Sequence, residues 1–480
     1  MNELFGRQEI YTTVSNITKE NVVNELTKAL AVHSENSRQI DYLYRYMKGE
    51  QPILAREKKV RPDICNKIVE NHASEIALFT SAYFLGEPLT YVRRGERDSA
   101  SQDIGKLNNY MFFEDKASHD KDLATWMAIG GIGYRMILPD KVAEVYEDEA
   151  PFEIDTPDPR YTFVVYNSGF GHKPMMGVRQ IYRSLEDENF DTIYCGYTDT
   201  NYFEVKNGVL TKWENHSLGD IPIFEYKLNM TRTGSFEPAI PLLDTMNNII
   251  SNRVDGIEQF VQSFLKFVNC DIEDDGLTKL KEKGAISIKS ISGLPADVDL
   301  IAQELNQSQV QTLVDYIYDQ ILTICGMPTT TKGGKSTSDT GAAVFLRDGW
   351  SQCEARAKDT ELLFKKSEKQ FLKLALRIIK GVEDFPLSLS EVECKFTRRQ
   401  HDALLTKTQS LNEMLQAGLA PAVAISACGL FNDPEDVAMQ SREYLGKWKP
   451  QKDVRADKET NLDNDLSLVG DDRDNSYDRG

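Results

Sequence analysis

Apolar residues recur at every third or fourth position through several long stretches of the chain, a spacing that places them on one face of an α-helix. At the start of the chain this pattern predicts four helices, over residues 20–48, 63–85, 101–112 and 118–129. Gly49 is expected to cap the first helix and Gly86 to end the second, which Pro88 prevents from continuing. The amino-terminal region is therefore predicted to be helical.

The pattern changes after Gly130. Short runs rich in β-branched and aromatic residues, such as "YRMIL", "YTFVVYN" and "DTIYCGYT", alternate with Gly, Pro, Asn and Asp as far as about residue 226. Such runs are typical of strands joined by turns. We therefore expect an antiparallel β region inserted between helices.

Two long amphipathic helices are predicted next, over residues 239–268 and 305–325. Their apolar stripes consist of Ile250, Val254, Ile257, Val261, Phe264 and Val268 in the first, and of Val310, Leu313, Ile317, Ile321 and Ile324 in the second. At about 1.5 Å per residue, the first helix would be some 45 Å long. The intervening sequences "KFVNCDIEDDG", "LTKLKEKG" and "AISIKSI" predict a strand and turn, a short helix and a strand. The two helices should thus carry a small α/β tip.

The longest helical pattern covers about residues 342–380, with one face formed by Leu346, Trp350, Cys353, Ala357, Phe364, Phe371, Ala375 and Ile378. A helix of that length, over about 50 Å, needs neighbours along it, from this chain or from another copy. Residues 399–447 are again helical, with interruptions at "GLAP" and "GLFNDP". Residues 451–480 hold nine acidic and five basic residues and are predicted to be a disordered acidic tail. The predicted fold class is α+β, mainly helical.

Charge limits the partners of the chain. Its 480 residues include 75 acidic and 56 basic ones, for a formal net charge of −19. A protein this acidic repels polyanions as a whole, so nonspecific binding to DNA or acidic membranes is excluded and any nucleic-acid contact must be local or weak. No apolar run approaches the roughly 20 residues that span a bilayer, and the first residues do not resemble a signal peptide. We expect a soluble protein made in a cytoplasm.

The cysteines are far apart and form no C-x-x-C pair. This spacing favours reduced, individually buried thiols over disulfides or a zinc site. The seven are Cys65, Cys195, Cys270, Cys325, Cys353, Cys394 and Cys428.

The loop "CGMPTTTKGGKSTSDTGAA" contains a Gly-Gly-Lys-Ser-Thr run that is similar to the end of a phosphate-binding P-loop. A P-loop also needs a first glycine to turn backbone N–H groups towards the phosphates, but Thr329 occupies that position. A P-loop also joins a buried strand to a helix. The loop in this sequence instead follows a predicted amphipathic helix that Gly326 and Pro328 end. The sequence therefore favours a polar loop over an ATPase site.

A second near-match is "DIEDDGLTKLKE", which resembles a calcium-binding EF-hand loop. The candidate ligands are Asp271, Glu273, Asp275 and Glu282, with Gly276 at the turn position. Glutamate is atypical at the third position, and a strand leads into the loop where an EF-hand has a helix. The alternative is an acidic turn whose carboxylates lie near the positive end of a short helix.

Catalytic patterns are absent from the sequence. The six histidines form no H-x-x-x-H or H-E-x-x-H pattern, and no G-x-S-x-G nucleophile elbow occurs. "GGIGYR" at 130–135 has Met136 where a dinucleotide-binding fingerprint has its third glycine, so a helix-to-strand turn is predicted there. We therefore expect no catalytic residues, no cofactor and no enzyme activity.

The stretch "YRYMKGEQPILAREKKVRPDICNKIVENHASEIALFTSAYFLGEPLTY" resembles the amino-terminal signature of tailed-phage portal proteins of the SPP1 type. The matching residues are Tyr46, Gly49, Pro52, Ile53, Leu54, Asn66, Lys67, Ile68, Gly86, Pro88, Leu89 and Tyr91. Further matches are the glycine-rich turn before "GYRMIL", "VVYN" at 164–167, "IPIFEYKLN" at 221–229 and "TSDTGAA" at 337–343. In the last, Thr340 replaces the usual serine. The resemblance spans roughly residues 42–380 in the expected order.

The resemblance implies a division of the chain into the regions of a portal subunit. The wing would comprise residues 1–238 and 342–395, the stem 239–268 and 305–325, the clip 269–304, the tunnel loop 326–341 and the crown 396–450. Portals of this family are rings, typically of twelve copies, at one capsid vertex of the virion. Double-stranded DNA is packaged and ejected through them. The implied partners are other copies of the chain, terminase, the head-completion (adaptor) protein, and the major capsid and scaffolding proteins, assembled in the host cytoplasm.

A channel that passes DNA in both directions must not hold it tightly, because each neutralised phosphate adds affinity. An acidic wall with a few lysines on a flexible loop meets that requirement. We expect Lys332 and Lys335, beside Gly333 and Gly334, to touch passing phosphates. The alternatives are a nucleotide-dependent enzyme with a P-loop-like site and an oligomeric scaffold without a channel.

Overall fold

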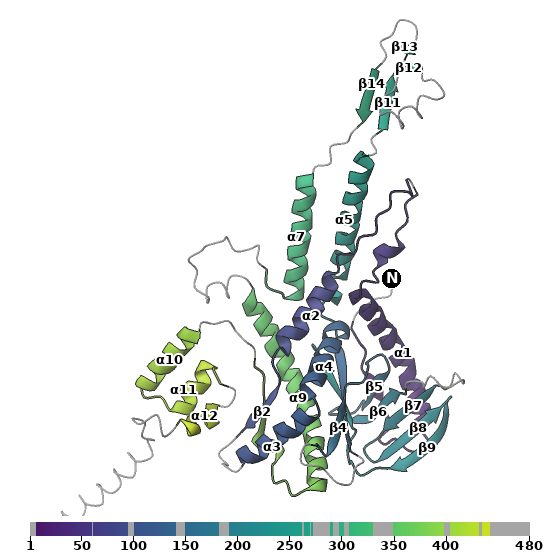
Figure 1. Ribbon diagram of the computed structural model, residues 1–480. Coiled ribbons are helices and arrows are strands. Elements are labelled where there is room, and N and C mark those ends of the chain that lie inside the picture. The colour runs from purple at the N-terminus through teal and green to yellow at the C-terminus, as the bar shows by residue number, and fades with distance from the viewer. Residues whose placement is uncertain are drawn as a thin grey trace, which may run out of the picture.

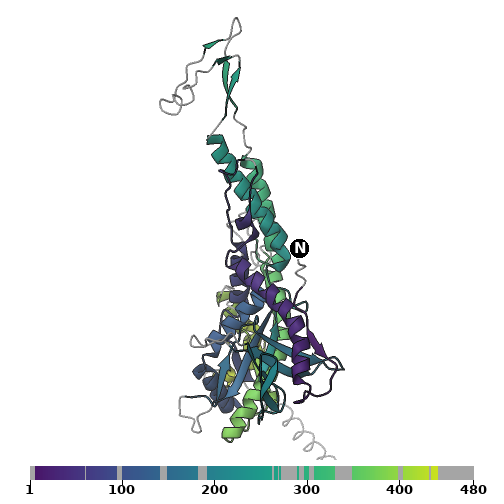
Figure 2. The same ribbon diagram turned by 90° about the vertical axis from the view of Figure 1, so that its right-hand side faces the viewer.

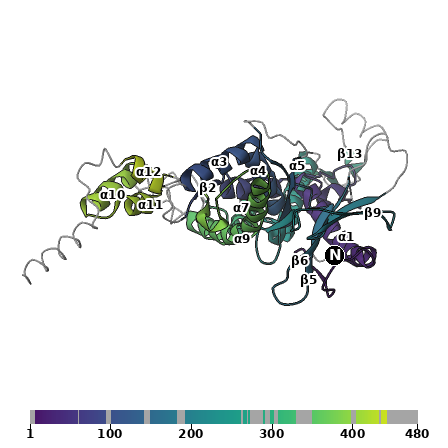
Figure 3. The ribbon, with the colours of Figure 1, turned by 90° about the horizontal axis from the view of Figure 1, so that it is seen from below.

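The computed structural model describes residues 6–59, 61–94, 100–140, 149–181, 192–261, 264–268, 270–271, 289–290, 297–301, 307–329, 349–397, 404–431 and 434–441. A broad body of helices and sheets carries two long helices that rise side by side, with short strands at their far end (Figures 1 and 2). Seen from below, a small helical unit lies at one end of the body and the sheet that contains β5 (Thr162–Asn167), β6 (Pro174–Gln180) and β9 (Val209–Asn215) at the other (Figure 3). The fold is mixed α+β and mainly helical, as predicted.

The helices predicted at the start of the chain are present. They are α1 (Val22–Met47), α2 (His72–Phe84), α3 (Ala100–Phe113) and α4 (Lys116–Gly130). Gly49 follows α1 in the left-handed region, with φ of +97°, as expected of a helix-ending glycine. The "GGIGYR" turn joins α4 to a strand through Gly131, whose φ is +77°. The prediction of a helix-to-strand turn there is confirmed.

The region after Gly130 is β-rich, as predicted. A six-stranded sheet has the order β1-β5-β6-β7-β8-β9. Its strands are β1 (Ile10–Thr12), β5 (Thr162–Asn167), β6 (Pro174–Gln180), β7 (Ile193–Tyr197), β8 (Asn201–Lys206) and β9 (Val209–Asn215). All neighbours are antiparallel except β1, which comes from the amino terminus and lies parallel to β5. Helix α1 covers this sheet, with Leu26 packed in the same core as Phe163 and Val165.

Two smaller sheets link the body together. Strand β3 (Ile132–Pro139) lies between β10 (Ile223–Lys227) and β4 (Phe152–Asp155). Strand β2 (Thr90–Arg93) pairs with β15 (Val392–Lys395), which comes from about 300 residues later in the chain. A short 3₁₀ turn, η3 (Leu389–Glu391), precedes β15, and two others are η1 (Pro52–Ala55) and η2 (Glu237–Ala239).

The two rising helices are α5 (Ile240–Val261) and α7 (Gln307–Cys325). Their facing sides share a core that contains Leu243, Met246, Ile317 and Ile321. The first helix was predicted to run to Val268, and this is wrong. The end of that sequence, Phe264–Val268, is strand β11, which pairs antiparallel with β14 (Asp297–Ile301).

The far end of the helix pair carries a second pairing, of β12 (Cys270–Asp271) with β13 (Lys289–Ser290). The short helix predicted from "LTKLKEKG" lies outside the residues that the structure describes, as does most of the strand predicted from "AISIKSI". A strand can replace a predicted helix here because "FLKFV" suits a strand as well as a helix. Pairing with a segment some 30 residues away then decides between them.

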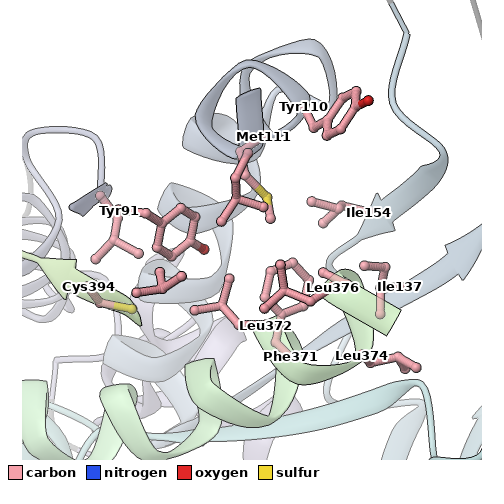
Figure 4. Packing of buried hydrophobic residues seen from close by; sticks show 14 of the residues in the cluster. Tyr91, Tyr110, Met111, Ile137, Ile154, Phe371, Leu372, Leu374, Leu376 and Cys394 are labelled. Carbon is pink, nitrogen blue, oxygen red and sulfur yellow. The ribbon is translucent and has the colours of Figure 1, made fainter. Parts of the chain in front are cut away.

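The long helix predicted over 342–380 is α9 (Trp350–Val382), and residues 342–348 lie outside the described part of the chain. It crosses the body beneath the helix pair (Figure 1). Phe364, Phe371, Leu372 and Ile379 on α9 belong to the largest core cluster. Phe371 and Leu372 lie among side chains from α3, β2 and β3 (Figure 4). The predicted need for neighbours along this helix is met within the chain.

A fully buried ionic cluster centres on Glu368 of α9. Arg135 Nη1 lies 2.7 Å and Lys116 Nζ 3.1 Å from the carboxylate oxygens of Glu368. The hydroxyls of Tyr91 and Tyr226 donate to the same carboxylate, at 2.5 and 2.6 Å. Burial by itself would raise the pKa of Glu368, but these cations and hydroxyls stabilise the charged form and lower the pKa to about 2. The cluster joins α9 to α4, β2, β3 and β10.

The last described elements are three short helices, α10 (Leu404–Gln416), α11 (Pro421–Cys428) and α12 (Pro434–Gln440). They agree with the predicted helical stretch and its two interruptions. Lys395 Nζ donates to the carbonyl of Phe431 at 3.0 Å and so connects this unit to β15. The predicted acidic tail, 451–480, lies outside the described residues.

The predicted burial of the thiols is confirmed for five cysteines, none of which forms a disulfide, and Cys65 is half-buried. Burial raises the pKa of the Cys325 and Cys394 thiols to about 12. The buried cysteines are Cys195, Cys325, Cys353, Cys394 and Cys428, and the side chain of Cys270 lies outside the described part.

Candidate functional site at the base of the helix pair

The segment between α7 and α9 starts and ends at one place. Helix α7 ends at Cys325, Gly326 turns the chain with φ of +71°, and the described chain stops after Thr329. It resumes at Gly349, where a Cβ atom would lie 3.7 Å from the Cα of Pro328. The described residues on either side of 330–348 therefore lie together at the base of the helix pair.

Arg356 of α9 holds this junction together. Its Nη2 atom donates to the carbonyl of Ile324 at 3.1 Å, in the last turn of α7. Its side chain also covers Gly326, where an added Cβ would come within 2.5 Å of the Arg356 Nε atom. A cation at the carboxyl end of a helix satisfies free carbonyl groups and opposes the helix dipole. Arg356 thus fixes the end of α7 on α9.

Aromatic residues fix the first turn of α9 against α2. The Trp350 ring lies 6.1 Å from that of Phe79 and 5.9 Å from that of Tyr83, measured between centroids. The hydroxyl of Tyr83 also donates to Glu354 at 2.9 Å. The return point of the 330–348 segment is therefore rigidly placed.

An open cavity of about 640 Å³ lies beside this junction. Apolar side chains make up most of its wall, and they come from α2, α7, α9 and the loop after β10. Among them, Met230 is 78% and Leu362 70% exposed. The wall includes Phe79, Tyr83, Met230, Met327, Cys353 and Leu362.

An extended segment, residues 66–70, binds along one face of α5. Backbone N–H groups of Asn66, Ile68 and Glu70 donate to side chains on one buried face of α5. The acceptors are Asp255 at 2.7 Å, Ser251 at 3.0 Å and Asn247 at 2.9 Å. Two extended residues advance about 6.6 Å and four helical residues about 6 Å, so the donors and acceptors match in spacing.

The three hydrogen bonds from residues 66, 68 and 70 to α5 form a polar ladder. This ladder contradicts part of one prediction. A helix was expected over 63–85, but α2 begins only at His72. The N–H groups of residues 66, 68 and 70 bond to α5, and the extended backbone that presents them cannot be helical. The tertiary contact has therefore replaced the first part of the predicted helix.

Asp255 is the ladder residue that also forms ion pairs, with two basic side chains. Arg56 Nη1 and Lys58 Nζ both lie 3.0 Å from Asp255 Oδ2. Burial by itself raises the pKa of Asp255, but hydrogen bonds from Asn66 and the nearby cations lower it below its usual value. The loop at 56–58 and the segment at 66–70 are thus both anchored on one carboxylate of α5.

The other rising helix, α7, is tied to the start of α2. The hydroxyl of Tyr318 donates to Glu75 at 3.0 Å, and the His72 ring packs on the Tyr318 ring at 4.6 Å. The Nδ1 atom of His72 lies 2.7 Å from a Glu75 oxygen. Burial raises the pKa of Tyr318 to about 12, and its bond to Glu75 adds to this effect.

The residues predicted for DNA contact, Lys332, Gly333, Gly334 and Lys335, lie outside the described residues, within the 330–348 segment. The predicted amphipathic helix before this segment is present as α7. Among the calcium candidates, the backbone of Asp271 lies on β12, whereas Glu273, Asp275 and Glu282 are outside the described part. Both interpretations stay predictions.

Sequence reasoning missed Arg356 and the ladder acceptors Asn247, Ser251 and Asp255. A signal for the acceptors was present, since three polar residues at intervals of four occupy one face of a helix whose neighbouring face is apolar. Buried polar residues at such spacing need partners from another element. No comparable signal marks Arg356.

The family model for phage portal proteins of the SPP1 Gp6-like type matches residues 26–456. The chain belongs to this family. The resemblance found in the sequence is thereby confirmed for this portal protein. A comparison with curated proteins found no match.

Two solved structures similar to the portal chain come from gene transfer agent particles. One is "Neck of empty GTA particle computed with C6 symmetry", at 12% identity and a TM-score of 0.46, covering 75% of this chain and 90% of the other. The second is "Virion of native gene transfer agent (GTA) particle", at 12% identity and a TM-score of 0.43, covering 82% and 94%. In the described part of this portal chain, no helix is both long and apolar enough to cross a membrane.

Proposed function

We propose that copies of this portal protein form a ring around a channel through which double-stranded DNA is packaged and ejected. The observation that carries the proposal is the base of the helix pair, where the described residues on either side of the 19-residue segment 330–348 lie at one fixed point. In a ring, that geometry presents one loop per subunit at the same level of the channel. Subunit number twelve is what the family resemblance suggests.

We assign the regions of the subunit as the family resemblance implies. Helices α5 and α7 form the stem, and the strands beyond them form the clip. The body with the six-stranded sheet and α9 is the wing, α10–α12 are the crown, and residues 326–341 are the tunnel loop. The ladder to Asp255 and the Arg356 junction then act as the two fixings of the stem on the wing.

Electrostatic repulsion lowers the friction between the ring and the passing DNA. A ring of subunits with a net charge of −19 each repels the phosphates of passing DNA. Lys332 and Lys335 on each tunnel loop supply transient contacts that position the duplex without trapping it. The wall and the loops thus have opposite and complementary roles.

The clip is the docking surface for terminase during packaging and for the head-completion protein afterwards. Its short paired strands lie at the far end of the stem, where they are furthest from the body (Figure 1). The wing faces the major capsid and scaffolding proteins during assembly in the host cytoplasm. ATP hydrolysis belongs to the terminase.

Negative-stain electron microscopy of the purified protein tests the proposal. A ring with a central hole supports it. Closed assemblies without a hole would favour the alternative of a scaffold without a channel. A protein that stays monomeric at all concentrations would contradict both.

The nucleotide-dependent enzyme has less support. Helix α7 leads directly into the loop that carries Gly-Gly-Lys-Ser-Thr, where a P-loop needs a buried strand. Thr329 also lacks the backbone freedom of the missing glycine. Steady ATP turnover by the purified protein alone, abolished by K335A, would reverse this conclusion.

A further inference from the structure

The turn between β5 and β6 carries a fully exposed aromatic side chain. Phe170 has a relative exposure of 108%, the highest of any large apolar residue among those described. Gly169 and Gly171 flank it, and Gly171 has φ of +88°. The side chain therefore projects from the tip of a hairpin and makes no packing contact with its own chain.

The tip that presents Phe170 is well anchored. Asn167 accepts the N–H of Gly169 at 2.7 Å and donates to the carbonyl of Val14 at 2.9 Å. The N–H of Ser168 donates to the carbonyl of Thr12 at 2.9 Å. A rigid aromatic anchor loses little conformational entropy on binding. These are the properties of a binding knob.

The cavity beside Met230 has the complementary properties. It is open, about 640 Å³ in volume, and largely apolar, and it lies between α2, α7 and α9. Interface anchors of high energy are commonly aromatic side chains that fill such pockets. Because Phe170 is fully exposed, it does not occupy the cavity of its own chain.

Charges next to the two features are also complementary. Lys173 follows Phe170 on the hairpin and is exposed, without a side-chain partner among the described residues. Asp359 lines the cavity and is exposed, likewise without a partner there. The second charge at the cavity, on Arg356, is already directed at the carbonyl of Ile324. A lysine entering with Phe170 would therefore meet a free carboxylate.

We propose that Phe170 of one subunit inserts into the Met230 cavity of the next, with Lys173 against Asp359. The knob and the cavity are different surfaces, so the contact is head-to-tail and generates a ring when the rotation closes. This inference rests on the proposed ring and specifies which surfaces join neighbouring subunits. It also places the knob of one wing directly against the α7–α9 junction that carries the tunnel loop of the next.

Site-specific photocrosslinking of the assembled protein tests the contact. Phe170 is replaced with p-benzoylphenylalanine, and the same replacement at Phe112, which is 77% exposed on α3, is the control. Irradiation should join neighbouring subunits through position 170, with crosslinked peptides that contain Met230 or Leu362. The control should give no product at that cavity. Rings in which position 170 crosslinks elsewhere, or only within one chain, overturn the inference and leave the ring standing.

Charge reversal gives an independent test. Both K173D and D359K should weaken the ring, and the double variant K173D/D359K should restore it. F170A should raise the protein concentration at which half of the rings dissociate by roughly tenfold, the effect of losing one aromatic anchor. Mass photometry measures these shifts. No loss with F170A, or no rescue in the double variant, contradicts the proposal, whereas a wild-type protein without rings contradicts the proposed function as well.

Discussion

The backbone N–H of Ile68 donates a hydrogen bond to the Ser251 hydroxyl at 3.0 Å, between an extended segment and a helix. The Ser251 side chain is fully buried, so no water replaces it as an acceptor. This bond is the middle rung of the ladder that runs from Asn247 to Asp255. It shows how one face of α5 fixes a segment that would otherwise be helical.

Replacing this acceptor should destabilise the protein. We expect S251A to lower the free energy of unfolding by about 1–3 kcal/mol, because it leaves the N–H of Ile68 buried without a partner. T245A is the matched control, since Thr245 is an exposed hydroxyl on the same helix and should change stability by less than about 0.5 kcal/mol. Chemical denaturation measures both. Equal effects of the two variants would show that the ladder contributes nothing.

The Glu368 cluster predicts acid sensitivity. The pKa of this carboxyl is about 2 in the folded protein and near 4.5 when unfolded, so it binds fewer protons when folded. Its contribution to stability is therefore complete above about pH 4.5 and is lost as the pH falls towards 2. E368Q should flatten the fall in stability over that range. It should also cost about 1–3 kcal/mol at neutral pH, because the buried cations Lys116 and Arg135 lose one of their two carboxylate partners and keep only Asp120.

Denaturation curves at several pH values measure this effect. The control is E258Q, at an exposed position on α5, which should keep the pH dependence of the original protein. A wild-type protein whose stability is level between pH 4.5 and 2 would contradict the assigned role of Glu368.

The turn at Gly326 should not tolerate a side chain. G326A places a Cβ within 2.5 Å of Arg356 and forces alanine into φ of +71°, at a cost of about 1–3 kcal/mol. G381A is the control, because Gly381 is helical with open space around it and should gain about 0.5–1 kcal/mol. The double variant G326A/R356A separates the two causes. If it recovers stability relative to G326A, the steric contact with Arg356 is confirmed as one of them.

The lysines of the tunnel loop should affect DNA and not assembly. We expect K332A/K335A to form intact rings but to package or retain several-fold less DNA, since the phosphate contacts are lost. K369A/K380A removes the same charge from exposed positions on α9 and should package normally. Nuclease-protected DNA per particle is the measurement. Normal packaging by K332A/K335A would remove the assigned role of these lysines.

The local sequence pattern was sufficient to predict those helices, turns and strands whose conformation depends mainly on their own residues. The helices α1, α3, α4 and α7, the turn at Gly131 and the strands between β3 and β10 follow directly from apolar spacing and from glycine. The end of α7, with Gly326 directly after the helix, was also predicted from the sequence. In these segments, propensity and the tertiary environment favour the same conformation.

The conformation of the other segments depends on residues that are distant in the sequence. Residues 66–70 are extended because Asn247, Ser251 and Asp255 accept their N–H groups, and Phe264–Val268 is a strand because Asp297–Ile301 pairs with it. Apolar spacing reports which face of a segment is buried, but not what lies against that face. The sequence by itself therefore determined the helical framework and the family of this portal protein. Only the tertiary structure showed how Arg356 and the ladder fix the pair of long helices, because those bonds join residues 32 to 189 positions apart.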